Sequence, residues 1–194
     1  MFPDPASDSV FHSPVHAASE SQHSHAPEEI AAILKGRGWL GAQSDFAVDP
    51  GMQEWLARAA ELLGPHAATS AELASLLKPL FSYEAADLLR RTENQEVLAR
   101  SGAREVIREF ANRVLDGGDL DSDRFKQIVD EMKLAVPYRS RAMFHPIRLA
   151  LTGRAGEGEL DRVILLMDSA AKLNFAVPVK STRQRILEFC AALD

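Results

Sequence analysis

Apolar side chains recur every three or four residues along most of the chain from Glu28 onward. This spacing places them on one face of an α-helix, whereas a half-buried strand would show strict alternation. No alternating β-branched run is long enough to indicate a strand, so we predict an all-α fold. The pattern predicts helices over residues 28–36, 52–63, 70–80, 83–91, 94–115, 122–134, 159–167 and 181–193, and a further short helix that ends at Gly153.

Helix-breaking and capping residues mark the ends of several of these segments. A proline is tolerated in the first turn of a helix, so Pro146 is expected to begin the helix that Gly153 ends. The run from Asp116 to Asp119 contains two glycines and is expected to end the longest helix. Residues 1–27 are rich in Ser, Pro, Ala and His without a helical period, so we predict a disordered tail there.

The composition excludes several protein classes. Hydrophobic residues make up 46% of the 194 positions, yet no apolar run approaches the roughly 20 residues needed to cross a bilayer. The N-terminus lacks the basic and apolar regions of a secretory signal. Cys190 is the single cysteine, so an internal disulfide is impossible, and we expect a cytoplasmic location.

Charge is distributed unevenly along the chain. The net charge is −6, but the residues from Arg139 onward include nine Lys or Arg and six Asp or Glu, a net +3. The preceding residues therefore carry −9. Such asymmetry is expected if one end of the chain meets phosphate, although chance clustering on a solvated surface gives the same pattern.

Four arginines near residue 140 are interleaved with aromatic side chains. The arginines are Arg139, Arg141, Arg148 and Arg154, and the aromatic residues are Tyr138, Phe144 and His145. Unstacked bases of an RNA loop bind against rings and guanidinium planes, and phosphates pair with arginine. We therefore predict that the four arginines and Phe144 bind RNA. The alternative is that Phe144 belongs to the core and Arg148 caps a neighbouring helix.

A second group of arginines lies on the longest predicted helix. Arg100, Arg104 and Arg108 recur every fourth residue and would share one helix face. Such a face can follow a phosphate backbone, so Arg104 and Arg108 are also candidate RNA-binding residues. Neighbouring glutamates would equally produce an ordinary solvated face with salt bridges, and that alternative stays open.

No metal, cofactor or catalytic site is predicted. His23 and His25 have a spacing that holds a metal ion only weakly without further ligands. The run from Asp119 to Asp123 resembles the start of a calcium loop, but Arg124 occupies the position that requires glycine. There is no glycine-rich phosphate loop after a strand and no nucleophile motif, so we expect no catalysis by this chain alone.

Residues 143–153 carry the most specific motif of the chain, M-F-H-P-I-R-L-A-L-T-G. A weaker motif begins at Thr69 as T-x-x-E-L and ends in P-L-F at Phe81. In these two motifs and in the order of its helices, the segment 29–175 resembles the C-terminal anticodon-binding region of class I glutamyl-tRNA synthetases.

The resemblance implies two small helical subdomains that form a cage around the anticodon arm of a tRNA. We place their boundary at the glycine-rich break, which gives 28–116 and 117–194, the latter including the C-terminal helix. Arg148 is the first residue that the resemblance carries over, and the motif leaves open whether it contacts RNA or braces the helix pair. His66 stands where the family usually has a basic residue, and the family's catalytic H-x-G-H and K-M-S-K-S motifs have no counterpart.

The sequence thus favours a non-catalytic RNA-binding module. The expected partner is tRNA or another structured RNA, and a synthetase or other translation protein is a further expected partner. Two alternatives stay open. One is a helical protein-interaction or vestigial scaffold that binds no RNA, and the other is a partner of a separately encoded synthetase catalytic half.

Overall fold

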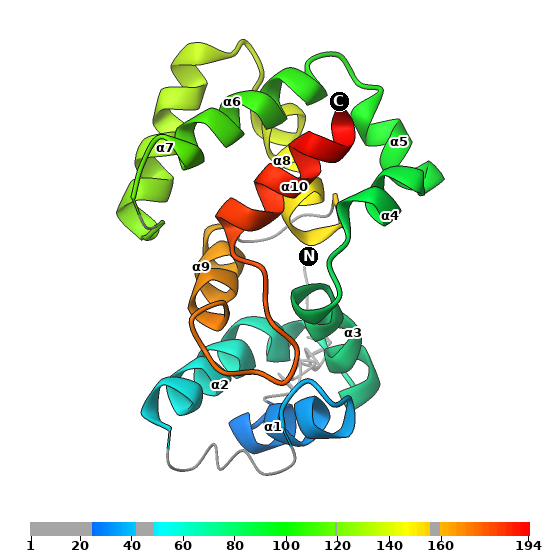
Figure 1. The fold of residues 1–194 in the computed structure, drawn as a ribbon, viewed down its shortest axis with the longest axis vertical. Coiled ribbons are helices and arrows are strands. Elements are labelled where there is room, and N and C mark those ends of the chain that lie inside the picture. The colour runs from blue at the N-terminus through cyan, green and yellow to red at the C-terminus, as the bar shows by residue number, and fades with distance from the viewer. Residues whose placement is uncertain (1–24, 42–48, 119, 156–159) are drawn as a thin grey trace, which may run out of the picture.

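The fold consists of helices that gather in two groups (Figure 1). The computed structural model describes residues 25–41, 49–118, 120–155 and 160–194. Ten α-helices and a short 3-10 turn cover most of these residues, and no strand occurs among them, so the all-α prediction is confirmed. In the part of the chain that is described, no helix combines the length and the apolar character needed to cross a membrane.

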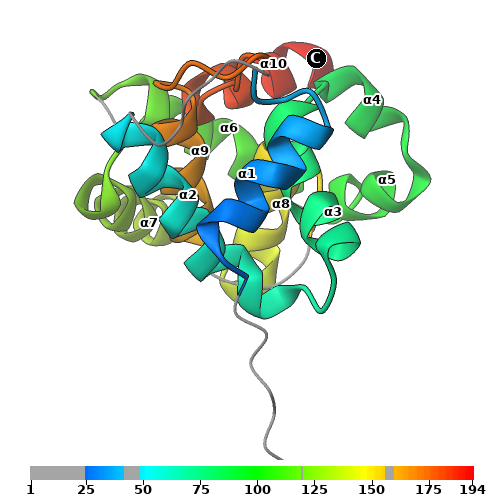
Figure 2. The ribbon, with the colours of Figure 1, turned by 90° about the horizontal axis from the view of Figure 1, so that it is seen from below.

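The first group is built from the N-terminal helices. It contains α1 (Pro27–Gly36), α2 (Pro50–Leu63), the 3-10 turn η1 (Gly64–His66) and α3 (Ser70–Phe81). Helix α1 packs against both α2 and α3, and Figure 2 shows it crossing this end of the molecule. The starts of the two neighbouring helices are capped by side chains, because Asp49 accepts from the first amides of α2 and Thr69 from the Glu72 amide.

The second group contains the remaining seven helices of the described chain. They are α4 (Ala85–Arg90), α5 (Thr92–Leu98), α6 (Ala103–Leu115), α7 (Ser122–Ala135), α8 (Ser140–Thr152), α9 (Leu160–Ala170) and α10 (Thr182–Leu193). Helix α6 packs on α7, α8 and α10, whereas α9 contacts α2 of the first group as well as α7. The predicted cap at Gly153 is confirmed, because this residue ends α8 with a φ of 73°. Ser181 begins α10 in a capping box.

An aromatic cluster joins the first group to the connection between α9 and α10. The Trp39 and Phe81 rings stack with centroids 4.8 Å apart, and Trp55 and Phe175 meet Phe81 edge-on. The Trp39 carbonyl also accepts a hydrogen bond from the Ala176 amide at 2.8 Å. Residues 171–181, which run from α9 past α2 and α3 before entering α10, are thereby fixed (Figure 1).

The prediction of one long helix over 94–115 is wrong, because the chain breaks there into α5 and α6. Gly102 has a left-handed φ of 80°, and a Cβ at this position would lie 1.9 Å from the Tyr138 ring. The ring therefore occupies the space in which a continuous helix would carry a side chain. Arg100 lies outside α6, so only Arg104 and Arg108 share a helix face.

The predicted place of Pro146 is also wrong. Helix α8 begins at Ser140, so Pro146 lies in its middle and removes the internal hydrogen bond to the Ala142 carbonyl. The helix extends toward its N-terminus because Met143 and Ile147, one turn apart, are both buried.

The predicted N-terminal tail over residues 1–27 is too long, because its last residues belong to the folded part of the described chain. Residues 1–24 lie outside the described part, but His25 is only 9% exposed and α1 already starts at Pro27. Hydrogen bonds from the His25 ring to Glu29 and Ala67 hold this segment in place. The predicted boundary between two subdomains at residue 116 stays a prediction.

A buried cation links helices from both groups. The Arg185 side chain of α10 is 0% exposed, and its guanidinium donates to the carbonyls of Pro79, Leu80 and Leu151 at 2.7–2.9 Å. Its Nε donates to the Lys180 carbonyl at 3.0 Å. These carbonyls lie at the C-terminal ends of α3 and α8 and before α10, where helix carbonyls lack partners within the helix.

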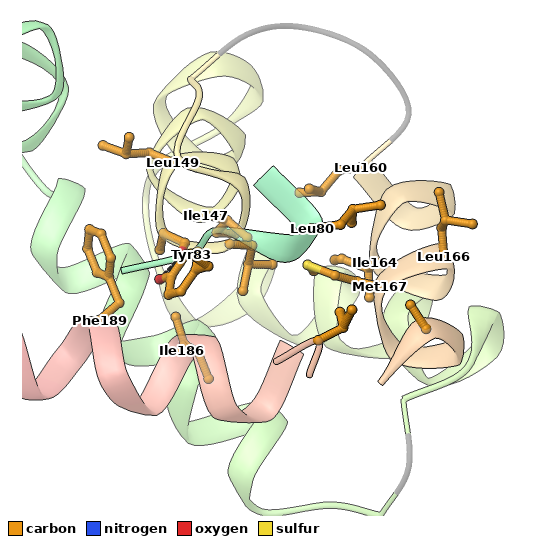
Figure 3. Close-up of a cluster of buried hydrophobic side chains, with 14 of the residues drawn as sticks. Leu80, Tyr83, Ile147, Leu149, Leu160, Ile164, Leu166, Met167, Ile186 and Phe189 are labelled. Carbon is orange, nitrogen blue, oxygen red and sulfur yellow. Dashed lines mark hydrogen bonds between the residues drawn. The ribbon is translucent and has the colours of Figure 1, made fainter. Parts of the chain in front are cut away.

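The aromatic ring of Tyr83 covers this cation. The Arg185 guanidinium carbon lies 4.6 Å from the Tyr83 ring centroid, and the Tyr83 hydroxyl donates to the Ala150 carbonyl. Figure 3 shows Tyr83 between Ile147 of α8 and Ile186 of α10. Burial lowers the pKa of the Arg185 guanidinium to about 10, so it stays charged at neutral pH.

We expect Arg185→Met to lower the free energy of unfolding by about 3–5 kcal/mol, because several buried carbonyls lose their donor. The stability of Arg185→Lys should lie between those of Arg185→Met and the wild type, since an ammonium group cannot reproduce the planar, forked set of donors of a guanidinium. Arg90→Met, whose side chain is 75% exposed, is the matched control and should change little. Urea unfolding measures all three, and equal effects of Arg185→Met and Arg90→Met would contradict the structural role.

We expect Gly102→Ala to destabilise the fold by about 2–4 kcal/mol, because the left-handed backbone and the Tyr138 ring both exclude a Cβ. Gly118→Ala is the control, since a Cβ there meets nothing within 4 Å. The same unfolding measurement applies, and a Gly102→Ala protein as stable as the control would show that the break between α5 and α6 does not need glycine.

Candidate RNA interface

A cleft of about 620 Å³ lies where α2, η1, α3, α8 and α9 meet. Its walls are largely apolar, and they include Leu62, Leu63, Leu76, Val163 and Leu166. Its basic side chains are His66, Arg148, Arg154, Arg162 and Arg185, and Glu61 is the single acidic residue among the described residues that line it. The cleft therefore combines an apolar interior with an excess of positive charge.

One face of α8 leads into this cleft. Arg141, His145, Arg148 and Thr152 follow one another at intervals of four, three and four residues, which places them on the same helix face. All four are exposed or half-buried, whereas Met143, Ile147 and Ala150 on the opposite face are buried. The stripe ends at Arg148 and Thr152, which line the cleft.

Arg148 occupies an intermediate environment at the end of this stripe. Its side chain is half-buried, and the loss of water around it lowers the pKa of the guanidinium. A partly dehydrated guanidinium interacts more strongly with an approaching anion than a fully hydrated one does. Between Arg139 and Ala155 the sequence contains four arginines and no acidic residue, so the positive charges of this segment are close together along the chain.

Arg154 reaches across the cleft to α3. Its Nη2 donates to the Ser75 carbonyl at 3.1 Å, and its backbone amide donates to the Thr152 hydroxyl at 3.3 Å. The side chain stays exposed despite this contact. Arg148 and Arg154, both predicted from the sequence to bind RNA, thus line the same cleft.

The other residues predicted near this region have different surroundings. Arg139 caps the C-terminal end of α7, because its guanidinium donates to the carbonyls of Lys133 and Val136 at 2.5 and 2.6 Å. Phe144 is half-buried and packs against the core. Arg141 is exposed on the α8 stripe. Their predicted contacts with RNA stay predictions.

Arg104 and Arg108 lie apart from the cleft, at the C-terminal end of α10. Arg104 donates to the Leu193 carbonyl at 3.3 Å, and Arg108 forms an ion pair with Asp194. These partners are eight or nine residues beyond Arg185, which is roughly 12 Å along the helix. The structure therefore brings Arg148 and Arg154 together, but not with Arg104 and Arg108.

Two arginines of the cleft, Arg162 and Arg185, are absent from the set predicted from the sequence. Arg185 has a signal in retrospect, because it occupies the buried stripe of α10 together with Phe189 and Leu193. Arg162 has no such signal in the sequence, since an exposed arginine on an amphipathic helix is common. No group of three His, Cys, Asp or Glu residues in the described segments has the geometry of a metal site.

Comparison with known proteins identifies the family of this chain. The chain matches the family model of the anticodon binding domain over residues 21–170. It is similar to glutamate–tRNA ligase 2 of Syntrophus aciditrophicus (strain SB), with 26% identity over 76% of the chain and 29% of that relative. The glutamate–tRNA ligase of Bacillus licheniformis is 26% identical over 59% of the chain and 23% of its own length.

A shorter match has a higher identity. The glutamate–tRNA ligase of Sulfurihydrogenibium sp. (strain YO3AOP1) is 32% identical over 36% of the chain and 14% of its own length. The chain thus spans less than a third of these relatives, and no solved structure matches it significantly. Because the family model covers most of the chain and the helical fold agrees, the chain belongs to the anticodon-binding domain family of the glutamate–tRNA ligases.

Proposed function

We propose that this protein binds the anticodon loop of a tRNA, with the cleft between α3, α8 and α9 as the site that receives an unstacked base. The observation that supports this most is the position of Arg148 and Arg154, which line one apolar-walled cleft. The relatives named above are glutamate–tRNA ligases, so tRNA is the first RNA to test.

The shape of the cleft fits a base better than it fits a continuous helix. A volume of about 620 Å³ lies within the range of about 300–1,000 Å³ that pockets for small ligands occupy. Apolar walls such as Leu76 and Leu166 offer surface against which a base splayed from a loop can pack. A duplex would present its bases stacked and out of reach.

The positive charge along α8 suits the RNA phosphates next to such a base. Arg141 and Arg148 are separated by about 10 Å along one face of the helix, which is the span of one to two nucleotides in an extended strand. Arginine binds phosphate through two parallel hydrogen bonds and stacks on bases through its plane. The single stripe thus supplies both kinds of contact beside the cleft.

We expect Arg148→Gln and Arg154→Gln each to weaken binding of an anticodon stem-loop by about ten- to a hundredfold, the loss of one charge-assisted contact. Arg90→Gln, which removes an exposed arginine of α4, is the control and should bind as wild type does. Fluorescence anisotropy with labelled stem-loop measures the affinity. Equal affinities of all variants would place RNA elsewhere, and no binding by wild type at low salt would favour a scaffold without RNA binding.

We expect binding to weaken with salt, with a slope of log K against log salt of about −2 if three arginines neutralise phosphates. The same titration with Arg148→Gln distinguishes two roles for this residue. A contact to phosphate should reduce the slope by about 0.7, whereas a contact to a base should lower the affinity and leave the slope unchanged. A flat dependence in the wild type would contradict a phosphate interface.

A further inference from the structure

The His25 ring makes two hydrogen bonds that require it to be protonated. Its Nδ1 lies 2.8 Å from the Glu29 carboxylate and its Nε2 lies 2.9 Å from the Ala67 carbonyl oxygen. Both partners accept hydrogen bonds, and a neutral imidazole carries a single N–H. The imidazolium form satisfies both contacts, whereas the neutral ring would direct a lone pair at one of the two oxygens.

These contacts lie beside η1 and the residues that follow it, which form part of the cleft wall. The His25 backbone nitrogen lies so close to Gly64 that a Cβ there would be 3.4 Å away. Glu29, the partner of His25, also accepts a hydrogen bond from the Ser70 hydroxyl at 2.5 Å. The pair thus connects the start of α1 to the middle of the segment 64–70 through Ala67 and to its end through Ser70, and residues Pro65 and His66 of this segment line the cleft.

We propose that His25 is a positioning residue whose imidazolium holds residues 64–70 in the conformation that lines the RNA cleft, so that this segment loosens as the pH rises. The inference rests on the proposed function only for its effect on RNA. The hydrogen bonds to Glu29 and then to Ala67 raise the pKa of His25, and those from Ser70 and His25 lower the pKa of Glu29.

The direction of the pH effect follows from these shifts. Because the folded protein holds the His25 proton more tightly than the unfolded chain does, the stabilisation is complete below the ordinary histidine pKa of about 6.5. It disappears as the pH rises through the raised pKa of the folded state. On the acid side the pair is lost only when Glu29 becomes protonated. The other charged or titratable groups on the elements around His25 are Glu28 and Lys35 on α1, Glu54, Arg58 and Glu61 on α2, His66 on η1, and Glu72 and Lys78 on α3.

Hydrogen exchange of the full chain tests this proposal without RNA. Protection factors of the amides in 64–70, corrected for the intrinsic exchange rate, should fall between about pH 6 and about pH 8.5 in the wild type. In parallel, the imidazole resonances of His25 should titrate above the ordinary range. Unchanged protection over this interval, or titration of His25 below about pH 6.5, would overturn the proposal.

Two variants separate a proton-dependent contact from a merely structural one. His25→Gln should lose protection of 64–70 at every pH, because it cannot carry the charge. Glu29→Gln should keep protection at every pH, because its amide can donate to the neutral Nδ1 while Nε2–H still donates to Ala67. His66→Gln removes the other imidazole of this segment and should leave the pH dependence of protection intact. A pH-dependent Glu29→Gln protein would contradict the pairing.

The link to RNA is measured separately. Wild-type affinity for the anticodon stem-loop should decrease from about pH 6 to about pH 8.5, and Glu29→Gln should abolish that decrease. If the stem-loop binds equally at both pH values while the protection of 64–70 still changes, the positioning role for RNA is wrong. If no RNA binds under any condition, the proposed function fails, and the exchange data still decide whether His25 holds the segment.

Discussion

The structure depends on one buried cation whose partners are carbonyl groups. Helices α3 and α8 end near each other in the interior, and the last carbonyls of a helix have no partner within it. These ends also carry partial negative charge from the helix dipole, so a guanidinium between them satisfies hydrogen bonds and charge together. Arg185 supplies that group from α10, under the Tyr83 ring. The same side chain is one of those that line the cleft, so one buried residue contacts both the helix ends that it joins and the candidate RNA site.

Several other arginines also bind carbonyls at the ends of helices. Arg139 caps α7, Arg183 caps α6 through the carbonyls of Leu115 and Gly117, and Arg104 contacts the end of α10. In the sequence these residues look the same as Arg148 and Arg154, because composition and spacing do not show which carbonyls lie nearby. The distinction between an arginine that ends a helix and one that lines a cleft arises only in the tertiary structure.

Most helices could be predicted from the sequence, and the two errors have a common physical origin. Apolar periodicity is local, so it gave α1 to α3, α7 and α10 within a few residues of their ends. The division of α5 from α6 depends on Tyr138, which is distant from Gly102 in sequence and adjacent in space. The early start of α8 depends on burial of Met143 in the core. The candidate site shows the same difference between local and tertiary information. Arg148 and Arg154 lie in one short segment and were predicted from the sequence, whereas Arg162, Arg185 and the apolar walls come from separate parts of the chain and were not.

The position of the two tryptophans gives the protein an internal optical reporter. The chain contains only Trp39 and Trp55, and both belong to the cluster with Phe81 and Phe175. Trp55 is 1% exposed and its indole donates to the Leu166 carbonyl of α9, while Trp39 is half-buried on the Phe81 ring. Tryptophan fluorescence therefore originates entirely at the junction of α2, α3 and the 171–181 connection. Emission wavelength and quenching report on the hydration of that junction without any added label.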